Sequence, residues 1–109
     1  MYSNTLYSKT LKDSGLEVVD WNWENIFGDI GEPNYIKIKG MVKNNGTKTL
    51  ENVKIRISAY DADGNFLGMG QNYLNPSIIP PGSKASFKVR INDARCENDL
   101  RIEYKFEYE

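Results

Sequence analysis

The sequence predicts an all-β protein built as a sandwich of two sheets, because three features of the chain agree. Apolar and polar residues alternate along most of its length, and a period of two indicates strands with one buried face and one exposed face. Turn-forming residues interrupt these runs at short intervals, as in other all-β folds. At 109 residues, the chain has the length of one domain with its own hydrophobic core.

Six strands are expected, and turn residues separate them. Their expected ranges are 16–24, 35–44, 50–61, 65–74, 83–91 and 100–108. Asn45-Gly46 and Asp63-Gly64 tolerate positive φ, so they predict tight hairpin turns after the second and third strands. The alternation assigns the centre of the core to Ile36, Ile38, Val53, Ile55, Phe87 and Ile102.

Two positions have expected folding roles that need no ligand. Gly40 lies on the inward face of its strand, where a missing side chain leaves room for a large neighbour from the opposite sheet. Asp61 ends the third strand, and its carboxylate is expected to accept backbone N–H groups of the turn that follows.

Residues 1–15 are mostly polar, and we expect a flexible or loosely docked segment before a sandwich domain at residues 16–109. Within this segment, Tyr2, Leu6, Tyr7 and Leu11 suggest a short helix. The segment has no apolar run of signal-peptide length, and no part of the chain approaches the roughly 20 apolar residues of a membrane helix. Direct membrane insertion is therefore not expected.

Composition argues against several classes of function. The chain has no histidine, which removes the commonest general base and metal ligand, so we expect no enzyme, no metal and no cofactor. Its 14 basic and 15 acidic residues nearly cancel, which argues against a nucleic-acid binder. Cys96 is the single cysteine, so no disulfide within the chain is expected, and a small half-buried residue is the simplest interpretation of it.

Trp21 and Trp23 form the first candidate site, because they lie on the same side of the first expected strand. If that side faces the core, the indoles are packing residues. If it faces solvent, two indoles about 7 Å apart form a flat platform of the kind that stacks on sugar rings. Leu16 and Val18 lie on the other side of the strand and keep both alternatives open.

A basic face is the second candidate site. The second and fifth expected strands pair in one sheet of an immunoglobulin-like arrangement. Their outward faces would then place Lys37, Lys39 and Lys43 beside Lys88 and Arg90. Such a face could attract an anionic polymer or an acidic protein, whereas its simplest role is to keep the sheet soluble.

Several motifs resemble the FxLYD family of small immunoglobulin-like domains. The matching segments are Gly40-Met41-Val42-Lys43-Asn44, Ile57-Ser58-Ala59-Tyr60-Asp61, Gly64 with Leu67, and Ile79-Pro80-Pro81-Gly82 followed by Phe87. Ile57 and Ala59 replace the phenylalanine and leucine of the namesake motif, and both substitutes are apolar. The resemblance implies an immunoglobulin-like β-sandwich of six or seven antiparallel strands. It also implies a binding or scaffolding role in an extracellular or cell-envelope protein, without catalytic residues.

We therefore expect a non-catalytic interaction or scaffolding domain that binds protein through a sheet face or a sheet edge. Self-association through an edge strand is a further expectation. The alternative is a carbohydrate-binding module that uses Trp21 and Trp23 as its platform.

Overall fold

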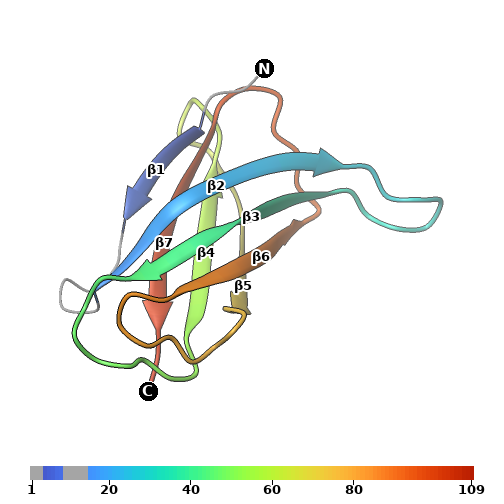
Figure 1. The fold of residues 1–109 in the computed structure, drawn as a ribbon. Coiled ribbons are helices and arrows are strands. Elements are labelled where there is room, and N and C mark those ends of the chain that lie inside the picture. Colours follow the sequence, from blue (N-terminus) through green and yellow to red (C-terminus); the bar gives the residue numbers. More distant parts are fainter. Residues whose placement is uncertain (1–3, 9–14) are drawn as a thin grey trace.

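The structure is a computed structural model that describes residues 4–8 and 15–109, with side chains described from residue 15 onward. The described residues form seven strands in two sheets and contain no helix (Figure 1). The strands are β1 (Asn4–Ser8), β2 (Leu16–Ile26), β3 (Tyr35–Asn44), β4 (Lys54–Tyr60), β5 (Phe66–Tyr73), β6 (Lys84–Asn92) and β7 (Leu100–Glu107). One sheet has the order β1-β7-β4-β5, and the other has the order β2-β3-β6.

The core lies between the two sheets and follows the predicted alternation. In β6, every second side chain is buried and the others are exposed, and β3, β4 and β7 repeat this pattern with few departures. The six residues expected at the centre of the core are all at most 4 % exposed, which confirms this prediction: Ile36, Ile38, Val53, Ile55, Phe87 and Ile102. The two-sheet, all-β fold is thus the one that the sequence predicts.

The N-terminal segment differs from the expectation. Residues 4–8 form strand β1, so the suggested short helix is wrong at these residues. β1 pairs in parallel with β7, with Asn4 opposite Leu100, whereas the six other strands pair only antiparallel to one another. The sheet therefore includes residues before the expected domain start at residue 16. The rest of that expectation, at residues 1–3 and 9–14, lies outside the described residues.

The two predicted hairpin turns have different outcomes. Asp63-Gly64 joins β4 to β5 as predicted, with Gly64 at φ 86°, and the Asp61 carboxylate accepts backbone N–H bonds from Asp63 and Asn65, each at 2.9 Å. Asn45-Gly46 is not a hairpin turn, because β3 and β4 lie in different sheets. The chain instead crosses between the sheets here, and Leu50 makes only an isolated bridge to Ile79 before β4 begins.

The two sheets are joined along the side where β5 meets β6. An added Cβ at Gly70 would lie 2.3 Å from the carbonyl oxygen of Arg90, so only glycine allows this approach of the two backbones. Asn72 donates a side-chain hydrogen bond to the carbonyl of Lys88 at 2.9 Å. Just after β5, Asn75 exchanges two backbone hydrogen bonds with Ser86 of β6. This junction holds residues of β5 beside the outer face of the three-stranded sheet.

Candidate functional site

The outer face of β3 and β6 carries the basic residues that the sequence singles out. The two strands pair antiparallel, as expected, with Lys37 opposite Arg90 and Lys39 opposite Lys88. Lys43 lies opposite Lys84, which the sequence analysis did not include. The alternation along β6 places Lys84 on the same face as Lys88, and that was the signal that could have found it. We call these six residues the basic face: Lys37, Lys39, Lys43, Lys84, Lys88 and Arg90.

Three like-charged pairs lie directly across from one another on this face, and such pairs destabilise a sheet. Two of the six cations have compensating partners. Lys37 lies 3.8 Å from the Glu24 carboxylate, and the Arg90 guanidinium lies over the Tyr35 ring, 3.8 Å from its centroid. Within residues 15–109, no carboxylate lies within ion-pair distance of the other four. Their positive charge is therefore open to a partner.

Strand β2 adds an acidic border along one side of the basic face. Glu24 lies opposite Lys37, and Glu17 lies opposite Lys43. Asp20 lies between them, opposite Met41. The outer face of the three-stranded sheet is therefore acidic along β2 and basic along β3 and β6. This border is not apparent from the sequence alone, because the pattern of β2 leaves the orientation of that strand open.

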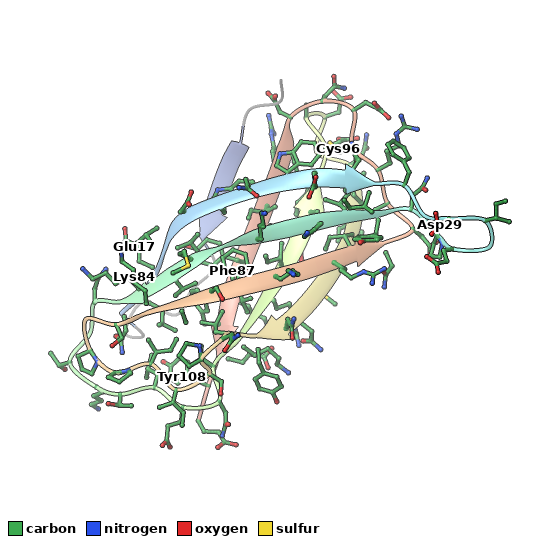
Figure 2. The ribbon with its side chains drawn as sticks, turned by 45° about the vertical axis from the view of Figure 1, so that its right-hand side comes forward. Glu17, Asp29, Lys84, Phe87, Cys96 and Tyr108 are labelled. Atoms are coloured by element: carbon green, nitrogen blue, oxygen red, sulfur yellow. The ribbon has the colours of Figure 1, made fainter. Side chains whose placement is uncertain are left out.

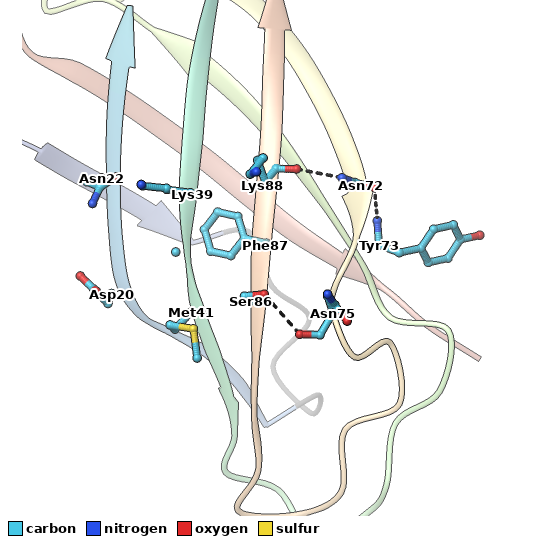
Figure 3. A pocket seen from close by; sticks show the side chains of 11 residues that line it. Asp20, Asn22, Lys39, Met41, Asn72, Tyr73, Asn75, Ser86, Phe87 and Lys88 are labelled. Carbon is cyan, nitrogen blue, oxygen red and sulfur yellow. Dashed lines mark hydrogen bonds between the residues drawn. The ribbon is translucent and has the colours of Figure 1, made fainter.

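A hollow of about 520 Å³ lies over the middle of this sheet (Figure 3). Gly40 and Phe87 line it through their backbone. The Phe87 ring points the other way, into the core, where it is 4 % exposed. Lys39 and Lys88 lie at its rim. Among the remaining lining residues, Met41 is apolar and the others carry polar groups: Asp20, Asn22, Asn72, Tyr73, Asn75 and Ser86. The hollow is thus mainly polar and partly basic, with one apolar side chain.

On the core side of β3, Gly40 makes room for neighbours in its own sheet. An added Cβ would lie 2.2 Å from the carbonyl oxygen of Asp20 and 2.8 Å from the Phe87 ring. Phe87 is the residue directly opposite Gly40 on the neighbouring strand. The expectation of a large neighbour is therefore correct, but the expectation that it comes from the opposite sheet is wrong.

Trp21 and Trp23 lie on the core-facing side of β2, where both are partly buried against the hydrophobic core. A β-bulge between Val18 and Asp20 explains how this is compatible with Leu16 and Val18, which also face the core. The bulge adds one residue, so the alternation restarts in the opposite phase. This packing favours the structural interpretation of the two indoles over an open platform for sugar rings.

The remaining candidate groups have structural surroundings. Cys96 is 2 % exposed, and burial raises the pKa of its thiol. The side chain of Asn25 binds the backbone of Cys96 through two hydrogen bonds of 2.7 and 3.0 Å, which ties β2 to the loop before β7. In the described part of the chain, no three His, Cys, Asp or Glu side chains gather to hold a metal ion. No helix among those residues is long and apolar enough to span a membrane.

In comparisons with known proteins, no family model matches this chain and no curated protein matches it.

Proposed function

We propose that this chain is a non-catalytic interaction domain that binds an acidic protein segment on the basic face of β3 and β6. The observation that carries the proposal is the row of three like-charged cross-strand pairs, of which Lys39–Lys88 and Lys43–Lys84 lie beyond ion-pair distance of any carboxylate in the described chain. Like charges directly opposite each other cost the sheet roughly 0.2–1 kcal/mol per pair. A bound carboxylate-rich segment offsets this cost.

The hollow supports a protein segment as the ligand. Met41 in its lining suits an apolar side chain, while Lys39 and Lys88 at the rim suit flanking carboxylates. A segment with both properties buries apolar area and pairs its charges at once. Because the lysines are exposed, this attraction weakens as salt is added.

The proposal includes an immunoglobulin-like arrangement of the strands and membership of the FxLYD family. In an immunoglobulin-like sandwich, the second strand pairs with the fifth, and the third pairs with the sixth. If β2 is taken as the first strand, β3–β6 and β4–β7 correspond to these two pairs. β1 then occupies the place beside β7 that a last strand takes in such domains. A role in an exported or cell-envelope protein rests on the same resemblance.

The experiment compares the binding of a labelled decaglutamate peptide to the wild type and to Lys39→Glu/Lys88→Glu. Each exposed charge contributes about 0.2–1 kcal/mol, so two reversals are expected to weaken binding on the order of tenfold. Lys48→Glu/Lys105→Glu is the matched control, because it makes the same change of charge at exposed positions off the basic face. Fluorescence anisotropy at low and moderate salt measures the affinity.

Two outcomes would contradict the proposal. One is that the double reversal on the basic face binds decaglutamate as well as the wild type does. The other is that an unstructured oligonucleotide of equal charge binds the wild type more tightly than the peptide, which would replace the acidic protein by a nucleic acid.

A further inference from the structure

The connection between β2 and β3 projects from the sandwich as a narrow hairpin (Figure 1). Its tip carries Ile30, which is fully exposed, so that a large apolar side chain lies in water in the isolated chain. Phe27 lies at the base of the connection, where the Arg95 guanidinium is 4.9 Å from the centroid of its ring. We call residues 27–34 the projecting loop.

The projecting loop is held by hydrogen bonds between its own residues. The N–H of Glu32 donates to the carbonyl of Asp29 at 2.8 Å, and Gly31 between them has φ 86°, as a type II turn requires. The Gly28 N–H donates to the Asn34 side chain at 3.0 Å. An added Cβ at Gly28 would lie 2.5 Å from the Glu32 carbonyl oxygen, so the two arms of the loop nearly touch. Such an ordered loop loses little entropy on binding.

The chemistry of the tip complements the hollow on the outer face of the three-stranded sheet. Asp29 and Glu32 flank Ile30, and the projecting loop contains no lysine or arginine. The hollow has the apolar Met41 in its lining and lysines at its rim. An isoleucine between two carboxylates thus matches an apolar side chain beside two ammonium groups.

The loop and the hollow of one molecule cannot meet each other. Gly40 lies five residues along β3 from Tyr35, where the projecting loop ends, which is a distance of about 17 Å. The loop also extends away from the sheet, so that Asp29 lies at one end of the molecule while Lys84 and Glu17 lie at the other (Figure 2). A contact between these two surfaces therefore requires two molecules.

We propose that the projecting loop of one copy docks in the hollow of a second copy, with Ile30 beside Met41 and over the backbone of Gly40. Asp29 and Glu32 then lie beside Lys39 and Lys88 of the neighbouring copy. This inference rests on the proposed function, and it identifies the acidic partner as the chain itself. Because the loop and the hollow are different surfaces, the contact is head-to-tail and leaves one free loop and one free hollow at the ends of each assembly.

A single loop tip in a shallow hollow buries less than the roughly 1,200–2,000 Å² of a stable interface. The association is therefore expected to be weak, with a dissociation constant of about 0.1–1 mM, and to depend on salt. Sedimentation velocity over a series of protein concentrations at low salt measures it. The wild type is expected to form larger species as its concentration rises and to dissociate when salt is added.

Two variants test the two sides of the contact separately. Ile30→Ser removes the apolar side chain at the tip of the loop, and Lys39→Glu/Lys88→Glu reverses the two charges at the rim of the hollow. Each variant alone is expected to remain monomeric. An equimolar mixture retains one intact loop and one intact hollow, so it is expected to form a complex of two copies and nothing larger. Ile78→Ser is the matched control, because Ile78 is an exposed isoleucine in another loop and its loss is expected to leave association unchanged.

A wild type that remains monomeric at all concentrations would overturn the inference, as would an Ile30→Ser variant that associates like the wild type. The decaglutamate assay separates this failure from that of the proposed function. If the basic face binds the peptide while the wild type stays monomeric, the self-contact is wrong and the acidic-partner proposal stands. If Lys39→Glu/Lys88→Glu binds decaglutamate as tightly as the wild type does, the proposed function is wrong, whatever the state of association.

Discussion

Asn44 is the one fully buried polar side chain among residues 15–109, and its hydrogen bonds are all made. Its amide nitrogen donates to the carbonyls of Lys48 and Ile79, each at 2.8 Å, and its side-chain oxygen accepts from the N–H of Gly46 at 2.9 Å. Its backbone also binds Ser83 and Gly82. Asn44 therefore ties the crossing between the sheets to the turn before β6. Its place in the segment Gly40-Met41-Val42-Lys43-Asn44 was visible in the sequence, whereas these hydrogen-bond partners were not.

We predict that Asn44→Leu lowers the free energy of unfolding by about 2–4 kcal/mol, because it leaves buried carbonyl and N–H groups without partners. Chemical denaturation at pH 7 measures the change. Asn45→Ala is the control, since the Asn45 side chain is exposed and its loss is expected to cost less than about 0.5 kcal/mol. Equal effects of the two substitutions would show that the buried network does not stabilise the fold.

Asp61 provides a pH-dependent contribution to stability. The backbone N–H of Asn65 is the main cause that lowers the pKa of the Asp61 carboxyl below its ordinary value of 3.8. Because the folded-state pKa is the lower one, the stabilisation is present above about pH 4 and is lost as the pH falls through the folded-state pKa. We predict that Asp61→Ala is less stable than the wild type at pH 7, and that the difference narrows below pH 4.

Urea denaturation at several pH values tests this prediction. Asp63→Ala removes a carboxylate from the same turn and keeps the Asp61 bonds, so its stability relative to the wild type is expected to change little with pH. The role of the carboxylate would be contradicted if the free energies of unfolding of Asp61→Ala and the wild type differed by the same amount at pH 7 and at pH 3.

At the scale of the element, strands with regular alternation were predictable and irregular strands were not. The ranges of β3 and β6 match the sequence within one residue, because their apolar residues recur at every second position. In β2, the bulge at Val19 restarts the alternation, and a single sequence carries no signal for an inserted residue. The orientation of Trp21 and Trp23 therefore had to come from the structure.

We predict that Gly70→Ala separates β5 from β6, because the new Cβ would overlap the carbonyl of Arg90. The cost is about 1–3 kcal/mol of unfolding free energy, as for other overpacked sites. Met69→Ala changes an exposed neighbour on the same strand and is expected to cost less than about 0.5 kcal/mol. If Gly70→Ala is as stable as Met69→Ala, the junction between the sheets is not as tight as described.

At the scale of the whole molecule, the sequence predicts two sheets but not every connection between them. Asn45-Gly46 looks like a hairpin turn, yet Asn44 directs the chain into the other sheet through partners more than 30 residues away. β1 joins β7 through backbone pairing that has no strong side-chain pattern. The basic face was predictable because strands with outward lysines were expected to pair. The hollow depends on how β5 meets β6, and the shape of the projecting loop depends on Gly28 and Gly31; only the structure shows these surroundings.

The central claim is that the outer face of β3 and β6 binds an acidic segment, and amide NMR with decaglutamate tests it most directly. We predict concentration-dependent shifts of amides around the hollow, at Lys39, Gly40 and Lys88, which diminish as salt is added. Shifts confined to the outer face of β4 and β7, where Arg56 is paired with Glu107, would contradict the claim.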